Sequence, residues 1–202
     1  ALGLDISDEQ IAQMEAAAGS IDYDAADRYE QQLRHDVMAH VHTFADACPL
    51  ARPIIHLGAT SCYVGDNADI LILREAMALI LARLAETARA LYSFADEHKA
   101  LPTLGFTHFQ AAQPVTVGKR AALWLQDILY DIGLVEDFLR DLRPLGSKGT
   151  TGTQASFLEL FDGDYEKVKA LDRMVSQKMG FGWAVAVSGQ TYPRKLDSAI
   201  LA

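Results

Sequence analysis

The chain has 202 residues, half of them apolar, which is enough for a sizeable core in one large domain or two small ones. Its formal net charge of −9 argues against a nucleic-acid-binding protein, because such proteins usually need a basic face. Cys48 and Cys62 form no CxxC pair, which favours a reduced, cytoplasmic protein. The most apolar stretch, 70–84, contains three charged residues and is too short to cross a bilayer, so we expect no membrane partner.

Helical signals dominate the first part of the chain. Ser7 and Gln10 have the spacing of a capping box, and Gly19 is a natural stop, so a helix is predicted over residues 8–18. Apolar residues then recur at every third or fourth position, which predicts a second helix over 22–47. Two prolines follow, and we interpret the segment "IIHLGATSCYVGDN" after them as a loop.

Two long apolar helices are predicted next, over residues 67–99 and 114–143. Their apolar residues cover nearly every face, which is typical of a helix buried in a large core or a subunit interface. Thirty helical residues span roughly 45 Å, and a chain of this size cannot easily bury two such rods alone. The sequence therefore predicts an elongated all-α bundle that completes its core in an oligomer.

The segment "RHDVMAHVH", residues 34–42, resembles a set of metal ligands only at first sight. His35 and His42 are separated by two helical turns, roughly 10 Å, which is too far for one ion. His40 and His42 point in nearly opposite directions, and only Asp36 and His40 could share a ligand. Too few ligands converge, so no metal site is predicted. His40 falls on the apolar stripe and is expected in the core, whereas His35 is expected on a solvated face.

Three loops have polar compositions that allow two interpretations. The hydroxyls of "GATS", 58–61, can bind a carboxylate, although such segments are more often turns or helix caps. The loop "LGSKGTTGTQASF", 145–157, has the composition of a phosphate loop but not the Walker spacing, so it is a weak anion signal. The segment "GQTYPRK" is a generic loop with two cations.

His108 lies in the most polar part of "LPTLGFTHFQAAQPVTVGKR", just before an expected helix. A histidine is the usual proton donor near pH 7, and side chains in a loop before a helix can be aimed at a ligand. The residue types alone leave two interpretations open, a catalytic acid or a hydrogen-bonded loop histidine.

Taken together, these segments resemble the adenylosuccinate lyase family of the aspartase/fumarase superfamily. The similarity covers essentially the whole chain in the expected order, with "RHDVMAHVH" and "KGTTGTQASF" pointing to the adenylosuccinate branch. The resemblance implies an all-α fold in three domains and a homotetramer with shared active sites. It also implies cleavage of adenylosuccinate to AMP and fumarate and of SAICAR to AICAR and fumarate, in purine synthesis, with no metal or organic cofactor.

The resemblance also assigns roles to particular residues. His108 would be the general acid, which gives a proton to the departing nitrogen. The residues that would bind or orient substrate are Arg34, His35 and Asp36 (nucleotide), Thr60 and Ser61 (carboxylate), Thr107 and Gln110 (beside His108), Lys148 and Gln190.

Some parts of the family pattern are missing. The sequence has no loop of the type "SSxMPxKxNP", which carries the family's general base. We therefore expect residues 1–60 to be an incomplete N-terminal helical domain and 61–202 the first part of the central bundle, with the C-terminal domain absent. The chain lacks an initial methionine and stops within an expected helix, so we expect a fragment. Because it lacks the general-base loop, we expect no useful turnover from this fragment alone.

Two other functions remain open at this stage. One is another lyase of the superfamily, such as argininosuccinate lyase or fumarase, which "RHDVMAH" disfavours. The other is a non-catalytic helical assembly module, which the presence of His108, Thr60, Ser61 and Gln190 disfavours. A helical protein with incidental polar loops is disfavoured by five matching motifs in order.

Overall fold

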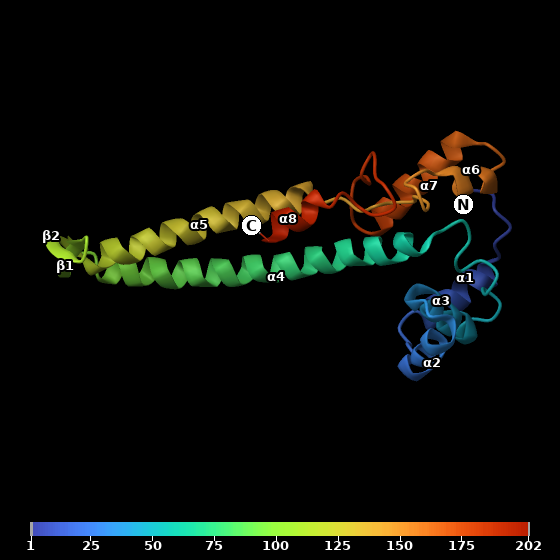
Figure 1. The fold of residues 1–202 in the computed structure, drawn as a ribbon, viewed down its shortest axis with the longest axis horizontal. Helices are drawn as coiled ribbons and strands as arrows, with labels where there is room; N and C mark the ends of the chain where they lie inside the picture. Colours follow the sequence, from blue (N-terminus) through green and yellow to red (C-terminus); the bar gives the residue numbers. More distant parts are fainter. Residues whose placement is uncertain (1, 202) are drawn as a thin grey trace. The chain divides into compact units, whose positions relative to one another are not determined.

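The computed structural model describes residues 2–201, which form two compact units. The first unit combines the N-terminal stretch up to Leu71 with the C-terminal stretch from Arg143, and the second unit is Ile72–Leu142. Within the described residues the elements are helices apart from one β-hairpin (Figure 1). The predicted all-α class is thus correct except for that hairpin. The domain boundary expected at residue 60 stays a prediction.

The first helix, α1 (Asp8–Ala17), confirms the sequence-based prediction. The Ser7 hydroxyl accepts a hydrogen bond from the Gln10 backbone N–H at 3.3 Å, and the Gln10 side chain accepts one from the Ser7 N–H at 3.0 Å. This capping box satisfies two backbone donors that a helix start leaves free. Ala17 at the end of α1 is buried in a cluster with Cys48 and Ala51.

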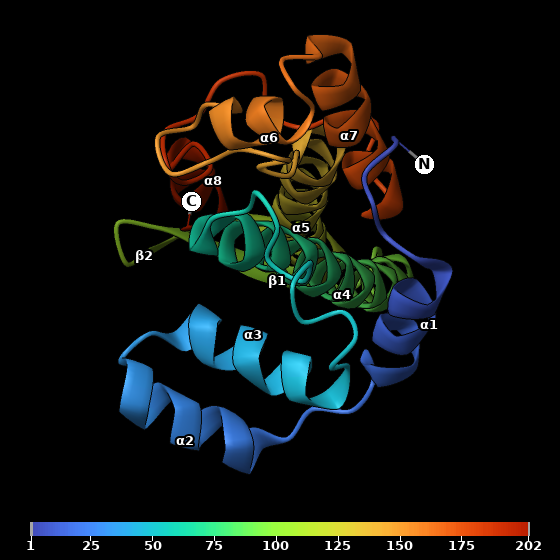
Figure 2. The same cartoon turned by 90° about the vertical axis from the view of Figure 1, so that its right-hand side faces the viewer.

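The single helix expected over 22–47 is wrong, because the chain breaks there into α2 (Tyr23–Leu33) and α3 (Asp36–Ala47), which lie side by side (Figure 2). Arg34 adopts a left-handed conformation with φ of 54° and ends α2, and His35 caps the start of α3. The buried side of α3 carries Ala39, Thr43 and Ala45. His40 is exposed, so its expected place in the core is also wrong.

Helix α4 (Ser61–Glu97) starts six residues before the predicted position. Residues 51–58 form turns, but the second half of the segment expected to be a loop is helical. The first turns of α4 belong to the first unit, together with α6 (Ala155–Leu160), α7 (Tyr165–Lys178) and α8 (Lys195–Leu201). Phe157, Phe161 and Val168 form the apolar cluster that joins α6 to α7.

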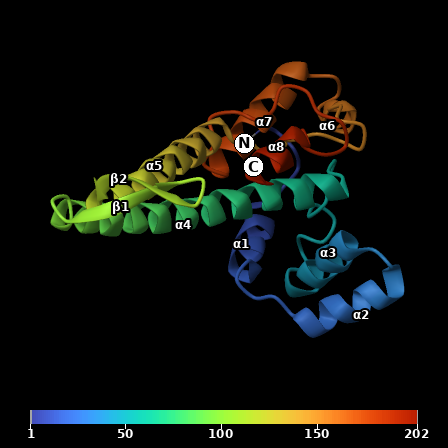
Figure 3. The same ribbon diagram turned by 60° about the vertical axis from the view of Figure 1, so that its left-hand side comes forward.

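The second unit contains the rest of α4, a hairpin and α5 (Val117–Asp141) (Figure 3). The hairpin pairs β1 (Pro102–Thr107) antiparallel with β2 (Gln110–Thr116). The helix start expected at Pro114 is therefore wrong, because Pro114 lies opposite Leu104 in the hairpin. A two-stranded ribbon tolerates proline, since each strand has an edge without ladder bonds.

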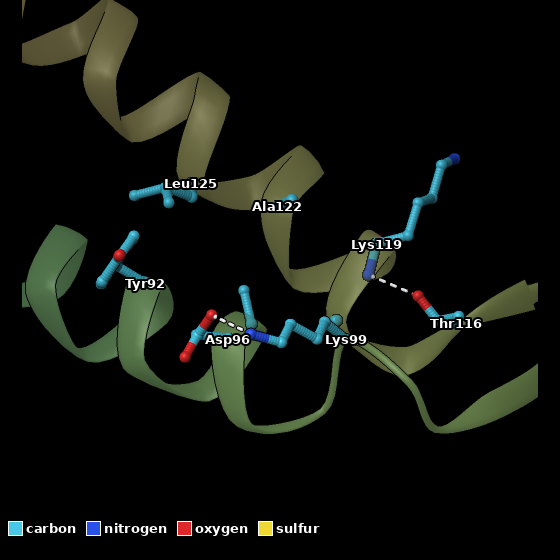
Figure 4. A pocket seen from close by; sticks show the side chains of 9 residues that line it. Tyr92, Asp96, Lys99, Thr116, Lys119, Ala122 and Leu125 are labelled. Atoms are coloured by element: carbon cyan, nitrogen blue, oxygen red, sulfur yellow. Dashed lines mark hydrogen bonds and ion pairs between the residues drawn. The ribbon is translucent and has the colours of Figure 1, made fainter.

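The hairpin is held at its base by a close approach of α4 and α5 (Figure 4). The Gly118 N–H donates to the His98 carbonyl at 3.0 Å, and the Lys119 N–H donates to the Thr116 hydroxyl at 3.1 Å. A Cβ on Gly118 would lie only 2.6 Å from the Lys99 Cα. A hollow of about 480 Å³ opens beside this crossing, with Tyr92 and Leu125 on its two sides.

The long helices of the second unit leave large apolar side chains in contact with solvent. Those on α4 are Ile72, Leu79, Ile80, Tyr92 and Phe94, and those on α5 are Leu123, Trp124, Leu129, Tyr130 and Leu134. None of the described helices is long and apolar enough to cross a membrane. Exposed apolar surface of this extent is typical of a protein–protein interface.

We predict that Gly118→Ala lowers the free energy of unfolding by about 1–3 kcal/mol or more, because the new methyl group meets backbone atoms that cannot move aside. The matched control is Gly133→Ala on the same helix, where no atom lies within 4 Å of the added Cβ. That change should raise stability by about 0.5–1 kcal/mol. Denaturant unfolding measures both, and equal effects would contradict the prediction.

Candidate functional site

His108 and Phe109 form the two-residue turn at the tip of the hairpin. Thr107 and Gln110 are the closing pair, and both turn residues have positive φ, 51° and 60°. Hairpins favour turns of this hand, but the conformation suits Asn and Gly rather than His and Phe. Strained backbone of this kind occurs often where a side chain must be held in one direction, which makes the turn a functional candidate.

The side chains of the turn are open to solvent. His108, Thr107 and Gln110 are all exposed, and Phe109 is fully exposed. The Arg120 guanidinium on α5 donates a hydrogen bond to the Leu104 carbonyl in β1. This bond links β1 to the helix that follows the hairpin. These three expected site residues therefore lie together on a ribbon anchored in the second unit.

In the first unit, His35 and Ser61 meet across 26 residues of sequence. The His35 Nε2 lies 3.1 Å from the Ser61 Oγ, and its Nδ1 accepts the Met38 backbone N–H at 3.4 Å as a helix cap. The His35 ring and the Ser61 hydroxyl therefore share a hydrogen bond. The structure thus joins "RHD" to "GATS", two segments that the sequence shows only as separate motifs.

Arg34 and Asp36 flank His35 and are both exposed. The Asp36 carboxylate lies 3.4 Å from His35 Nδ1, and Arg34 lines a hollow of about 510 Å³ with Asp27, Glu30 and Gln31. Exposed, adjacent cationic and anionic groups can bind a polar ligand through several hydrogen bonds.

The glycine-rich loop that contains Lys148 is closely packed. Gly146 and Gly152 have φ of 77° and 78°, and a Cβ on Gly152 would overlap the carbonyl oxygens of Ser188 and Gly189. The loop therefore lies directly against the segment that contains Gln190. Only glycine combines this φ with so close an approach of two backbones.

The Lys148 side chain points into the protein. It is only 4 % exposed, and its Nζ donates to the Leu145 carbonyl at 2.9 Å. Burial lowers the pKa of Lys148, partly offset by the negative charge of Asp172. Asp172 also accepts the Ser147 backbone N–H at 2.6 Å. In this arrangement the lysine stabilises its own loop, and its expected contact with substrate stays a prediction.

Gln190 is exposed on a loop that is held from both sides. The Val185 N–H donates to the Pro144 carbonyl at 3.0 Å, and the Tyr192 N–H donates to the Asp66 carboxylate at 2.7 Å. Asp66 and its neighbour Asn67, on the first turns of α4, were not singled out in the sequence. The signal available was two adjacent polar residues ahead of a strongly apolar helix.

The expected site residues thus form two groups. The first unit holds the "RHD" segment, Thr60 and Ser61, and the Lys148 and Gln190 loops, which are connected through the start of α4. The second unit holds Thr107, His108 and Gln110. Among residues 2–201, no three His, Cys, Asp or Glu side chains are arranged to hold a metal ion.

Comparison with known proteins assigns the chain to a family. A family model described as "Lyase" matches residues 9–178, which is most of the chain. The chain therefore belongs to this lyase family.

Individual relatives match most or all of the chain. It is 50% identical to the adenylosuccinate lyase of Schistosoma mansoni over 98% of its length, and 50% identical to that of Saccharomyces cerevisiae over 100%. It is 34% identical to the adenylosuccinate lyase of Pyrococcus abyssi over 75%. The chain spans 42% of the length of the first two relatives.

Solved structures show the same fold at lower identity. The fumarate lyase from Mesorhizobium sp. BNC1 matches with a TM-score of 0.83 and 24% identity, over 97% of this chain and 45% of that one. The β-carboxy-cis,cis-muconate cycloisomerase from Acinetobacter calcoaceticus matches with a TM-score of 0.76 and 23% identity, over 96% and 45%. The chain accordingly shares the largely helical fold of these two proteins.

We predict that His56, which follows Pro53 in the turns before α4, makes stability depend on pH. Burial, and secondly the charge of His35, lowers the pKa of His56 below its ordinary 6.5. As pH falls below about 6.5, His56 binds a proton in the unfolded chain, whereas in the folded protein it binds that proton only at a lower pH. The contribution of His56 to the free energy of unfolding is therefore complete above about pH 6.5, and it is lost as the pH drops from there through the pKa of His56 in the folded protein.

His56→Gln should make the stability of the protein fall less steeply between pH 7 and pH 5, as measured by denaturant unfolding at several pH values. His40→Gln removes an exposed histidine of α3 and serves as the control, with an unchanged slope expected. An unchanged slope in His56→Gln would show that this ring is not the titrating group.

Proposed function

We propose that the protein acts as an adenylosuccinate lyase, cleaving adenylosuccinate to AMP and fumarate and SAICAR to AICAR and fumarate in purine biosynthesis. The observation that carries this proposal is the 50% identity to adenylosuccinate lyases over nearly all of the chain. The exposed His108 at a strained turn and the joined "RHD" and "GATS" segments support it. We place the protein in the cytoplasm.

The proposed reaction is a β-elimination. A general base takes a proton from the carbon beside a carboxylate, and the bond from the next carbon to nitrogen breaks. The intermediate carries extra negative charge on that carboxylate, so it needs hydrogen-bond donors around it. The departing nitrogen needs a proton from a general acid. In our proposal His108 is that acid, and Thr107 and Gln110 beside it orient the ring or the substrate.

The expected site residues of the first unit are proposed to bind substrate. Thr60 and Ser61 are half-buried hydroxyls at the start of α4, and the partial positive charge of a helix N-terminus also favours a carboxylate. The exposed Arg34, His35 and Asp36 would contact the nucleotide, and the exposed Gln190 would contact substrate. Lys148 would supply positive charge nearby.

We also propose that the protein assembles into a homotetramer with active sites shared between subunits. The support is the apolar surface that α4 and α5 leave exposed in the second unit, including Trp124 and Tyr130. Helices with apolar residues on several faces are buried in bundles, and here a second copy would bury them.

The test of the function is cleavage of adenylosuccinate and SAICAR by the natural protein, followed by release of fumarate. We predict that His108→Ala lowers kcat by between about 100-fold and 10,000-fold with a much smaller change in KM, because a general acid acts mainly in the transition state. His98→Ala, which removes a partly buried histidine just after the end of α4, is the control and should leave kcat unchanged.

Unchanged kcat in His108→Ala would remove this residue from the mechanism. Fumarate release from argininosuccinate instead of adenylosuccinate would favour a different lyase of the superfamily. Folded, tetrameric protein with no activity on any of these substrates would favour the helical assembly module.

We further predict that His35→Ala weakens AMP binding, measured by calorimetry, about tenfold through the loss of one polar contact. The change also removes a helix cap, so His35→Asn is the matched variant, because asparagine caps helices well. Weakened binding is expected in both variants, with lower helix stability only in His35→Ala. Full affinity in His35→Asn would show that His35 serves as a cap alone.

A further inference from the structure

The first two turns of α4 bury two adjacent polar side chains. Asp66 is 6 % exposed and Asn67 is 5 % exposed. A buried carboxylate or amide destabilises a fold unless its hydrogen bonds are satisfied. The partners of these two side chains therefore show what they do for the structure.

Asn67 binds both backbone groups of Gly146, 79 residues away. Its Oδ1 accepts the Gly146 N–H at 3.0 Å, and its Nδ2 donates to the Gly146 carbonyl at 3.2 Å. The Nδ2 also donates to the Tyr63 carbonyl at 2.8 Å, within α4. The Asn67 amide thus links α4 to the loop that contains Lys148, through the same pair of N–H and C=O bonds that links two β-strands.

Asp66 holds the second loop. Its Oδ2 accepts the Tyr192 backbone N–H at 2.7 Å, and Tyr192 is itself buried, with its hydroxyl donating to Asp197 at 2.8 Å. A hydrogen bond to a carboxylate is stronger than one between neutral groups. Loss of the carboxylate would leave the Tyr192 N–H buried without a partner, two residues after Gln190.

The same two turns of α4 also begin with Ser61, which contacts His35. Ser61, Asp66 and Asn67 at the start of α4 are therefore each bonded to a different part of the chain. A helix end is a more precise support than a loop, and small displacements of binding groups reduce activity strongly.

We propose that Asp66 and Asn67 are positioning residues, which hold the Gln190 and Lys148 loops in a fixed position relative to the start of α4. This proposal rests on the proposed lyase function for its kinetic consequence. Its structural consequence, the fixed position of the Tyr192 and Gly146 backbones, can be measured without any substrate.

The experiment compares three variants of the natural protein. Asp66→Asn keeps an acceptor in the same place, Asp66→Leu removes it at similar volume, and Asp66→Glu keeps the charge but shifts it by one methylene. Hydrogen exchange of the Tyr192 amide should be slow in the wild type and in Asp66→Asn. It should be at least about tenfold faster in Asp66→Leu and Asp66→Glu, because the bond is lost or displaced.

The kinetic arm uses adenylosuccinate cleavage. We expect kcat/KM to fall about tenfold in Asp66→Leu and Asp66→Glu and to be largely kept in Asp66→Asn. The control is Thr43→Val, which removes a buried hydrogen bond of similar length, 2.9 Å to the Ala39 carbonyl, at constant volume elsewhere in the first unit. It should lower Tm without lowering kcat/KM.

Slow exchange at Tyr192 in both Asp66→Leu and Asp66→Glu would overturn the proposal. The proposal would also be overturned if kcat/KM fell in proportion to Tm, to the same extent in Thr43→Val as in the Asp66 variants. If Asp66→Leu does not fold, the comparison of Asp66→Glu with Asp66→Asn decides the result. A wild-type protein that does not cleave adenylosuccinate would refute the proposed function, and the amide exchange would still decide the positioning role.

Discussion

The buried polar start of α4 is the constraint on which the first unit depends. The segments around it, 144–154 and 184–192, contain many small residues and form neither helix nor strand over most of their length. Although Leu145 and Tyr192 are buried, these segments lack the regular backbone hydrogen bonds that hold a helix or sheet in a fixed geometry. The hydrogen bonds of Asp66 to Tyr192 and of Asn67 to Gly146 supply that fixed geometry instead.

The second unit supports its candidate catalytic residue, His108, in a different way. A two-stranded ribbon alone is marginally stable in water, so the hairpin needs support from the helices at its base. The contact of Gly118 with the end of α4 and the bond from Arg120 to Leu104 provide it. The tip can then keep His108 in a strained, exposed conformation.

Local signals in the sequence predicted the elements that depend on neighbouring residues. The capping box at Ser7 stabilises α1 within a single turn, and the prediction was correct to one residue. The break between α2 and α3 was missed, because Arg34 adopts a conformation that usually signals Gly or Asn. The hairpin was missed because Gly105 and Pro114 both argue against strands.

The sequence by itself determined the helical class, the two long apolar helices and the set of polar motifs, because these depend on residue type and short-range spacing. Only the tertiary structure decided that "GATS" lies against "RHD", that Lys148 points inward and that Asp66 and Asn67 hold two distant loops. The physical reason is that the bonds of Ser61 to His35, of Asn67 to Gly146 and of Asp66 to Tyr192 join residues 26 to 126 positions apart. Each partner is a backbone group or a common side chain with no sequence signature.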